Sequence, residues 1–367
     1  MRVCVLGLRG LPGVSGGVET HCEQLFPRLR RRRRDDRFVV VARQQYVDPH
    51  QPYEFEGLTI VPLQHLRGKY FEAFSSSIVG LFYAAFVAKA DVVHIHAIGP
   101  ALVAPLARLL GLKVIVTHHG TDYSRAKWNR FAKAVLRLGE RCAVHFANRV
   151  IVVSPSLAKR LAESFPGRKE NIVFIPNGAN HLDPEYADSD AIVDRFDLVD
   201  RPFVISVGRI VPEKGFHDLV EAFKKSGWNG RLVIVGGAEE DDPYWQSLRM
   251  KASENVIFTG TLARSELAVL LRRASLFILP SYHEGLPIAA LEAMAAGAPV
   301  LLSAIQPNLD LELPASHYFP VGNTEALAAK ITSDHRGFFL EADKVLANFD
   351  WNRIADATSQ LYASLAC

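Results

Sequence analysis

Short apolar runs alternate with segments of helical pattern along most of the chain. In the first half these runs are VCVLG (3–7), FVVVA (38–42), DVVHIH (91–96), KVIVTHH (113–119), RVIVVS (149–154) and NIVFIPNG (171–178). The rhythm resumes with FVISVGR (203–209), RLVIVGG (231–237), NVIFTG (255–260), LFILPS (276–281) and PVLLSA (299–304). Continuous β-branched runs separated by helices are typical of parallel strands buried on both faces. The pattern therefore predicts an α/β fold.

A polar stretch separates the two sets of runs and predicts a domain boundary near residues 178–195. The length of 367 residues exceeds one ordinary core and suits two domains. We expect two doubly wound, Rossmann-like domains, residues 1–185 and 186–349, facing each other across a cleft.

Unusual polar or glycine residues follow several of the predicted strands. Ligands of doubly wound sheets bind outside the carboxyl ends of the strands. Most polar residues at strand ends are simply solvated, but here they recur in both halves, which favours one shared ligand site. The residues are Arg9, His118, His119, Asn177, Arg209, Gly236, Gly260 and Glu284.

The segment GLRGLPGVSGGVETHCEQL (7–25) is a glycine-rich loop that leads into a helix starting near Val18. Gly16 and Gly17 would let backbone amides approach a phosphate at the positive end of the helix. The alternative is a flexible connector. A nicotinamide-dinucleotide site is disfavoured, because the spacing is not GxGxxG and the second strand ends without an acidic residue.

The segment SVGRIVPEKGF (206–216) places Arg209 and Lys214 on a loop bracketed by Gly208 and Gly215. Two cations on a glycine-bounded loop above a sheet suit a diphosphate group. The alternative is a pair of solvated surface cations.

The segment SYHEGLPIAALEAMAAGAPVL (281–301) keeps two carboxylates, Glu284 and Glu292, in almost wholly apolar surroundings. Carboxylates are rarely buried unpaired. Glu284 is expected in a loop, with the amides of EGLP at a helix start and Pro287 in the first turn. By helical spacing, residues 284, 288 and 292 would share a face. They would then accept hydrogen bonds from sugar hydroxyls. The alternative is an exposed helix face with incidental acids.

Composition and charge narrow the function classes. Hydrophobic residues make up 49% and charged residues 22%, as in a soluble globular protein. A net charge of +3 does not by itself indicate nucleic acid, and no partner of that kind is expected. Neither a disulfide framework nor a zinc site is suggested by the spacing of the cysteines, and a reducing cytoplasm fits best. These cysteines are Cys4, Cys22, Cys142 and Cys367.

The motif HEGLPIAALEAMAAGAPV (283–300), with VGRIVPEKG upstream and GGVET near the N-terminus, resembles the retaining glycosyltransferase family 4, of GT-B fold. The similarity covers essentially the whole chain. The segments 6–25 and 116–140 resemble in particular its bacterial branch of rhamnosyl- and related transferases that build surface polysaccharides. The segment FDWNRIADATSQLYASL (349–365) resembles the family's last helix, so residues 350–367 are expected to pack back on the first domain.

The resemblance implies a role for each of these motifs. Arg209 and Lys214 would bind the donor diphosphate and offset charge on the leaving group, so that no metal or other cofactor is needed. Glu284 would bind the donor sugar near the reacting carbon, and Glu292 would hold the nucleotide ribose. The distal phosphate would meet the amides of Gly285 and Leu286, and Gly16 and Gly17 would close the site from the first domain. Gly236 is also expected to bind the donor, and the base is expected near Gly260 and Ser281.

The histidine at the end of the 113–119 strand also matches the family. His119 would contact the donor sugar near the reacting centre, whereas the adjacent His118 would point the other way. His94 and His96 are expected to be packing or polar-lining residues. The implied reaction retains the anomeric configuration by same-face attack, in which the departing phosphate oxygen takes the acceptor's proton.

A basic run, PRLRRRRRDDR (27–37), is expected to end the first helix and lead into the second strand. It is either a solvated helix end or, together with the aromatic segment 69–86, a patch that meets an anionic membrane at the inner face of the plasma membrane. The acceptor would be a glycan or a polyprenyl-diphosphate-linked sugar. Two rivals stay open: a sugar-nucleotide epimerase of similar build, and a non-catalytic two-lobed sugar-binding protein.

Overall fold

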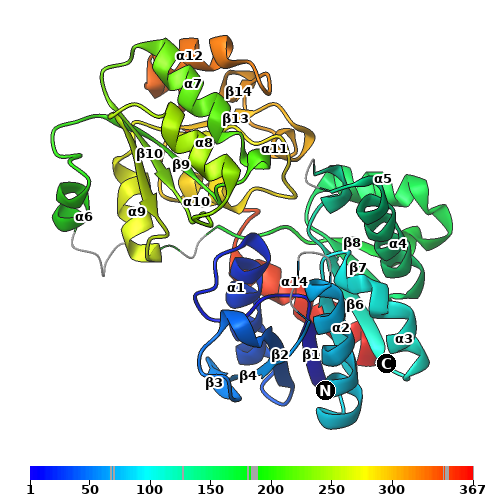
Figure 1. Ribbon diagram of the computed structural model, residues 1–367. Helices are drawn as coiled ribbons and strands as arrows, with labels where there is room; N and C mark the ends of the chain where they lie inside the picture. The colour runs from blue at the N-terminus through cyan, green and yellow to red at the C-terminus, as the bar shows by residue number, and fades with distance from the viewer. Residues whose placement is uncertain are drawn as a thin grey trace. The chain divides into compact units, whose positions relative to one another are not determined.

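The computed structural model describes residues 1–66, 68, 71–125, 128–179, 182, 189–341, 343 and 347–366. It divides into two compact units (Figure 1). The first combines Met1–Asn177 with the C-terminal helix α14 (Trp351–Ala366), and the second is Gly178–Asp350. The boundary expected after residue 185 lies outside the described residues.

The first unit is built on an eight-stranded sheet with the order β3-β4-β2-β1-β5-β6-β7-β8. All neighbouring strands are parallel except β3 and β4, which form an antiparallel pair at one edge. The strands are β1 (Arg2–Leu6), β2 (Arg37–Arg43), β3 (Tyr53–Phe55), β4 (Leu58–Leu63), β5 (Val92–His96), β6 (Lys113–His118), β7 (Arg149–Val152) and β8 (Ile172–Phe174).

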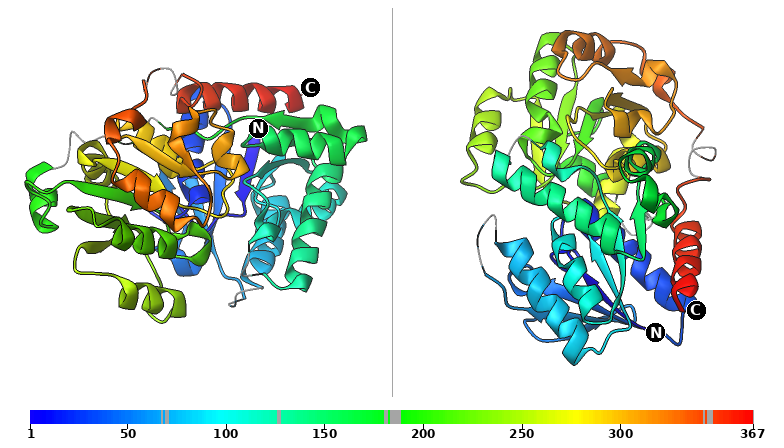
Figure 2. Two further views of the ribbon diagram at one scale, coloured as in Figure 1. Left: turned by 90° about the horizontal axis from the view of Figure 1, so that it is seen from above. Right: turned by 90° about the vertical axis from the view of Figure 1, so that its right-hand side faces the viewer.

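Helices cover both faces of this sheet, as the views in Figures 1 and 2 show. The helices are α1 (Gly17–Arg32), α2 (Glu72–Phe82), α3 (Ala104–Leu109), α4 (Arg130–Phe146), α5 (Pro155–Ser164) and α14. Shorter helical turns are η1 (Gln44–Tyr46), η2 (Tyr83–Val87), η3 (Pro100–Val103), η4 (Asp122–Ser124) and η5 (Pro166–Asn171).

Strand β1 shows why these runs are apolar on both faces. Val3 and Val5 belong to a core that includes α1 and α14, whereas Cys4 and Leu6 belong to the core on the opposite face. Successive side chains of a strand point to opposite faces, so a strand covered by helices on both sides needs apolar residues at every position.

Helix α14 completes the first unit. Its Trp351 and Tyr362 are fully buried in the same core as Phe26 of α1. In Figure 2, α14 (red) runs alongside the first unit. The expectation that the C-terminal segment returns to the first domain is therefore confirmed.

The second unit contains a six-stranded parallel sheet with the order β11-β10-β9-β12-β13-β14. Its strands are β9 (Phe203–Val207), β10 (Arg231–Val235), β11 (Val256–Gly260), β12 (Leu276–Leu279), β13 (Val300–Ser303) and β14 (Tyr318–Phe319). Its helices are α6 (Ser189–Arg195), α7 (Phe216–Ser226), α8 (Pro243–Lys251), α9 (Arg264–Arg273), α10 (Ile288–Ala295), α11 (Gln306–Leu309) and α12 (Thr324–Ile331), with the turns η6 (Pro212–Lys214), η7 (Ala315–His317) and η8 (His335–Phe338).

Both sheets are doubly wound, which confirms the predicted fold class. In the second sheet the chain runs outward from β9 to β10 and β11, then returns to place β12 on the other side of β9. The carboxyl ends of β9 and β12 therefore flank a topological switch point, the usual place for a ligand in such sheets. In the first sheet, β1 and β5 hold the equivalent position.

Candidate functional site

The loop after β9 is shaped by close backbone packing at the switch point. Gly208 and Ile210 donate backbone hydrogen bonds to Val235 and Gly237 after β10, at 2.9 and 3.0 Å. A Cβ atom on Gly215 would lie only 2.1 Å from the carbonyl oxygen of Pro280. With a φ of +69°, this position requires glycine on both counts. The tight approach holds the β9 loop against the β12 loop.

These two loops bring Lys214 and Glu284 into contact. The Lys214 Nζ atom lies 2.6 Å from Oε1 of Glu284, and the Ser281 hydroxyl donates to the same oxygen at 2.6 Å. The Lys214 side chain is 21% exposed and that of Glu284 is 10% exposed. A cation and a carboxylate in this partly desolvated position attract each other more strongly than an exposed pair would.

The surroundings of this pair fix both loops. The backbone amide of Tyr282 donates to the carbonyl of Glu213 at 2.9 Å, and the Tyr282 hydroxyl donates to Asp218 at 2.6 Å. The Asp218 hydrogen bond raises the pKa of Tyr282 to about 12, so the phenol stays neutral. Ser303 of β13 donates its hydroxyl to the carbonyl of Ser281 at 2.5 Å. The Lys214–Glu284 pair therefore rests on a rigid framework.

Other residues predicted for this site lie nearby along the same loops. Arg209 is the second residue after β9, and a Cβ atom on the preceding Gly208 would lie 3.4 Å from the Lys214 side chain. The Gly236 amide donates to the carbonyl of Gly260 at 3.0 Å, which joins the ends of β10 and β11. All of these loops leave the carboxyl edge of the second sheet.

Glu284 lies in a loop, as expected, but the helical face predicted for residues 284, 288 and 292 does not form. Helix α10 begins only at Ile288, and Glu284 lies in the preceding loop with Gly285 and Leu286. Pro287 ends this loop with extended backbone (φ −75°, ψ 94°), so the helical spacing argument does not reach residue 284. Glu292 is buried in the second turn of α10.

In the first unit, Glu19 occupies the start of α1. Its Oε1 atom accepts a hydrogen bond from the Arg9 amide at 3.0 Å and lies 3.6 Å from Nε of Arg9. A Cβ atom on Gly16 would lie 2.0 Å from Oε2 of Glu19, so this carboxylate folds over the helix start. Gly17 is the first residue of α1. The helix N-terminus thus holds a carboxylate of the chain itself, where the sequence analysis expected amides facing a phosphate.

Histidines meet at the carboxyl ends of β5 and β6. His96 Nδ1 lies 3.0 Å from His119 Nε2, and the His21 ring of α1 packs edge-on against His119 with centroids 4.9 Å apart. His21 Nδ1 lies 2.9 Å from the side-chain oxygen of Asn177. His118 turns the other way, as expected, with Nε2 2.8 Å from Glu140.

Burial keeps these rings neutral. It lowers the pKa of His21 to about 4 and that of His94 to about 3, and it lowers the pKa of His96 and His119 well below the usual value. His94 is held between the Tyr362 hydroxyl at 2.6 Å and the Thr117 hydroxyl at 2.7 Å, as a packing residue would be. His119 can therefore act near pH 7 as a neutral hydrogen-bonding group.

Three of these histidines could geometrically hold a metal ion. One nitrogen of each of His21, His96 and His119 lies within 4.8 Å of the others. Among the described residues, the Nε2 atoms of His21 and His96 have no hydrogen-bond partner. Neutral imidazoles are the form that binds zinc. No local sequence pattern places His21 and His96 beside His119, because only the sheet order and the docking of α1 bring them together.

In comparison with known proteins, each of the two units matches a different family model. Residues 15–181 match the family model of glycosyltransferase family 4, and residues 189–334 match that of glycosyl transferases group 1. An uncharacterized glycosyltransferase of Methanocaldococcus jannaschii is 24% identical over 99% of this chain and 98% of its own. A GDP-mannose-dependent alpha-(1-6)-phosphatidylinositol monomannoside mannosyltransferase of Mycobacterium tuberculosis is 34% identical over 55% of this chain and 54% of its own.

A capsular polysaccharide biosynthesis glycosyltransferase of Staphylococcus aureus is 27% identical over 55% of this chain and 56% of its own. Among solved structures, sucrose-phosphate synthase from Thermosynechococcus elongatus has a TM-score of 0.84 at 23% identity, covering 99% of this chain and 98% of its own. HepE of Anabaena in complex with UDP-glucose has a TM-score of 0.78 at 19% identity, covering 99% and 100%. Each of the two doubly wound units thus matches a glycosyltransferase family model, and the chain has the GT-B fold of these transferases.

Proposed function

We propose that this chain is a retaining, metal-independent transferase that moves a sugar from a nucleoside-diphosphate sugar to a glycan or a polyprenyl-diphosphate-linked acceptor. One observation carries the proposal: Lys214 and Glu284 meet on the two loops that flank the switch point of the second sheet. A diphosphate needs a cation and a sugar needs hydrogen-bond acceptors, and this pair offers both at one place.

Lys214 and Arg209 would bind the diphosphate and stabilise the charge that develops on it as the glycosidic bond breaks. Glu284 would accept hydrogen bonds from the sugar once Lys214 turns toward the phosphates. The amides of Gly285 and Leu286, just before α10, would meet the distal phosphate. Glu292 would hold the ribose, with the base near Gly260 and Ser281. Gly16, Gly17 and Gly236 would also contact the donor.

The printed descriptions of similar proteins support a nucleotide-sugar donor. The mycobacterial relative is named for its use of GDP-mannose, and HepE was crystallised with UDP-glucose. The staphylococcal relative acts in capsular polysaccharide biosynthesis. We extend these chemistries to this chain and favour a hexose or deoxyhexose donor in surface-polysaccharide synthesis, as in the rhamnosyltransferase-like branch of the family.

The reaction we propose retains the anomeric configuration. The bond between the anomeric carbon and the phosphate oxygen breaks, and a bond from the acceptor oxygen forms on the same face of the sugar. The acceptor's proton passes to the departing phosphate oxygen, so no protein base is required. Neutral His119 would hold the sugar near the reacting carbon by a hydrogen bond.

A panel of UDP-, GDP-, dTDP- and ADP-sugars tests the donor class. We expect one nucleotide series to raise the melting temperature of the chain and to support sugar transfer to an acceptor. NMR of the product should show the same anomeric configuration as the donor. Interconversion of the free donor without an acceptor would instead indicate an epimerase, and binding without hydrolysis or transfer would indicate a non-catalytic sugar-binding protein.

We also propose that the enzyme works in the cytoplasm, at the inner face of the plasma membrane. No described helix is both apolar and long enough to span a bilayer. Large apolar side chains are exposed around α2 and η2, namely Phe71, Phe74, Val79, Phe82, Phe86 and Val87. They would insert at the lipid interface. Lys69 and Tyr70 of the expected aromatic segment lie outside the described residues.

The structure weakens the contribution of the arginine run to that contact. The run ends α1 and leads into β2 as expected, but Arg31, Arg32 and Arg33 form ion pairs with Glu56, Asp356 and Asp36. Flotation with anionic liposomes tests the proposal. The double substitution Phe82→Ser/Phe86→Ser should reduce co-flotation several-fold, and equal partition of the wild-type and substituted chains would refute it.

A further inference from the structure

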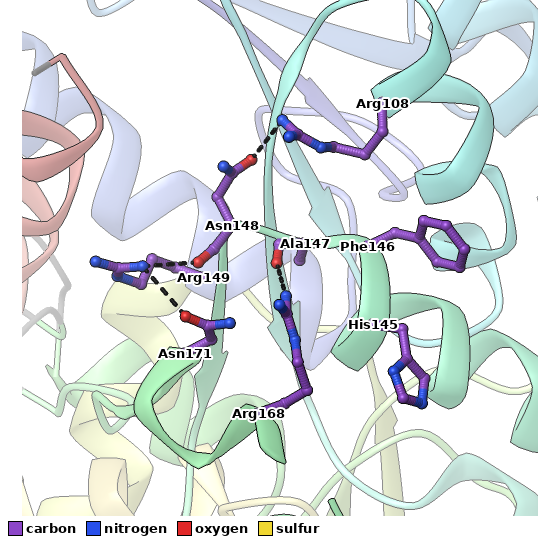
Figure 3. Close-up of a pocket in the computed structure, with 8 residues that line it drawn as sticks. All are labelled: Arg108, His145, Phe146, Ala147, Asn148, Arg149, Arg168 and Asn171. Atoms are coloured by element: carbon purple, nitrogen blue, oxygen red, sulfur yellow. Dashed lines mark hydrogen bonds between the residues drawn. The ribbon is translucent and has the colours of Figure 1, made fainter.

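A cationic hollow lies at the amino-terminal ends of strands in the first sheet, whereas His119 lies at the carboxyl ends. It has a volume of about 300 Å³ and is lined by Arg108, His145, Phe146, Ala147, Asn148, Arg149, Arg168 and Asn171 (Figure 3). Asn148 precedes β7, and its amide donates to the carbonyl of Val114 at the start of β6. Because β6 is six residues long, this end of the strand lies about 17 Å from the end that carries His119.

The lining is unusual in its charge. Three of the eight residues are arginines and none is acidic. Two half-buried arginines elsewhere in the chain pair with carboxylates: Arg160 with Glu140 at 2.6 Å and Arg43 with Glu72 at 2.7 Å. Among the described residues, no carboxylate forms an ion pair with any of the three arginines of the hollow.

Neutral acceptors hold the guanidinium groups in place instead. Arg108 donates to the side-chain oxygen of Asn148 at 3.0 Å and to the carbonyl of Leu112 at 3.1 Å. Arg149 donates to the carbonyl of Asn148 at 2.9 Å. In the amide orientation that satisfies both of its groups, the Asn171 oxygen accepts from the Arg168 guanidinium at 3.0 to 3.2 Å. In Figure 3, the Asn171 amide lies between Arg149 and Arg168. Each guanidinium is therefore oriented without being neutralised.

A purely structural role explains only part of this cluster. Arg168 donates to the carbonyls of Val144 and Ala147, which are unpaired groups at the end of α4, and so closes that helix. Arg149 donates to the carbonyl of Asn148 just past α4 through its Nη1 atom, and Arg108 likewise uses only its Nη1 atom among the described residues. Guanidinium groups have five N–H donors in a planar fork that matches phosphate oxygens. Donors of Arg108 and Arg149 therefore remain for a ligand.

We propose that this hollow, named here the arginine hollow, binds the phosphate group of a phosphorylated ligand. Arg108, Arg149 and Arg168 would supply charge-assisted hydrogen bonds to the phosphate oxygens. The exposed ring of Phe146 would pack against the rest of the ligand. Because the arginine hollow lies at the amino-terminal edge of the strands, this ligand is neither the donor nor the acceptor of the transfer reaction.

Titration of the full chain with inorganic phosphate, followed by calorimetry at constant ionic strength, tests the proposal. The double substitution Arg108→Gln/Arg149→Gln should weaken phosphate binding at least tenfold. Arg141→Gln, an exposed arginine of α4 outside the hollow, is the matched control and should bind as the wild type does. If the double variant does not fold, Arg149→Gln alone, which keeps the Arg108–Asn148 hydrogen bond, should still weaken binding several-fold.

Lys214→Ala separates this site from the proposed donor site, because phosphate could also bind there. Phosphate binding that survives Lys214→Ala and is lost in the arginine variant supports the proposal. Binding that is lost only with Lys214→Ala overturns it. So does a wild-type chain that binds no phosphate at 10 mM, a concentration about tenfold above a millimolar Kd.

Vesicles identify the source of the phosphate group. Flotation with phosphatidic acid but not phosphatidylcholine, removed by the arginine substitutions, supports a lipid headgroup as the ligand. Phosphate binding that depends on the same arginines, without flotation, supports a soluble phosphorylated compound.

Discussion

Among the residues that the structure describes, Lys214 has one close charged partner, Glu284 at 2.6 Å, and both side chains are largely shielded from water. If the lysine binds the leaving diphosphate, Lys214→Ala should lower kcat for transfer by about a hundredfold or more, since it removes charge stabilisation in the transition state. The melting temperature should change little. Steady-state transfer assays measure this, with Lys251→Ala in the last turn of α8 as a control lysine of the same unit. An active Lys214→Ala enzyme would contradict the assignment.

Glu284→Gln keeps the size of the side chain and removes its charge. The amide no longer pairs with Lys214 or accepts strongly from sugar hydroxyls, so transfer should fall by about tenfold to a thousandfold. Glu254→Gln, an exposed glutamate before β11, should leave the rate unchanged. Equal rates for Glu284→Gln and the wild type would remove Glu284 from the site.

At the scale of elements, the histidines of α1, β5 and β6 predict how stability depends on pH. The folded pKa of His21, His94, His96 and His119 is lowered by burial, so the unfolded chain binds more protons below about pH 6.5. The stability that the folded chain gains from keeping these rings neutral is therefore present above pH 6.5, and it is lost as the pH falls toward the folded pKa values. Between pH 7 and pH 5.5 the free energy of unfolding should fall by about 1 kcal/mol for each histidine.

Urea unfolding at the two pH values measures this loss, and the window lies above the range in which carboxylates titrate. His94→Gln should reduce the pH dependence by about one proton, because one buried neutral ring is removed. A free energy of unfolding that does not change between pH 7 and pH 5.5 would show that these rings are not buried as described.

Helix α14 offers a second prediction at this scale. Trp351 is fully buried, and its ring packs edge-on against His21 with centroids 5.5 Å apart. Trp351→Ala should destabilise the first unit by about 3–5 kcal/mol, because it leaves a large cavity. Thermal unfolding should show this loss, and Gln360→Ala on the exposed face of α14 should not. Similar melting temperatures for both variants would contradict the packing of α14.

The strands that could be predicted from sequence are those whose own residues form a recognisable apolar run. β-branched runs located eleven strands, since a strand covered on both faces is apolar throughout. The hairpin β3–β4 was missed, although Glu56 and Gly57, both with positive φ, form a two-residue turn typical of hairpins. Strand β14 has only two residues, too few for a periodic pattern.

The site was predicted less completely, for a physical reason. The cations after β9 and the glutamate after β12 follow strands, so the sheet rule indicated their common edge. The loop position of Glu284 was also expected, but Pro287 has extended backbone, so helical spacing does not apply between residues 284 and 288. The contacts of Glu19 with Gly16 and of His96 with His119 depend on tertiary packing that no local pattern encodes.

At the scale of the whole molecule, the account requires a reaction without a metal ion, yet the first unit holds three histidines that could ligate one. We expect transfer to be unchanged after treatment with EDTA, because Arg209 and Lys214 supply the charge that a metal would otherwise provide. A rate that falls with EDTA, recovers with a divalent ion and is lost in His21→Ala would instead assign a metal to His21, His96 and His119.

The central claim is that a nucleoside diphosphate binds at the loops after β9 and β12. The most direct test is the Kd of the nucleoside diphosphate and of the nucleoside monophosphate of the active series, measured by calorimetry for the wild type and Lys214→Ala. The account predicts that Lys214→Ala weakens the diphosphate at least tenfold, about 1.4 kcal/mol, and changes the monophosphate far less. Equal weakening of both ligands, or of neither, would contradict it.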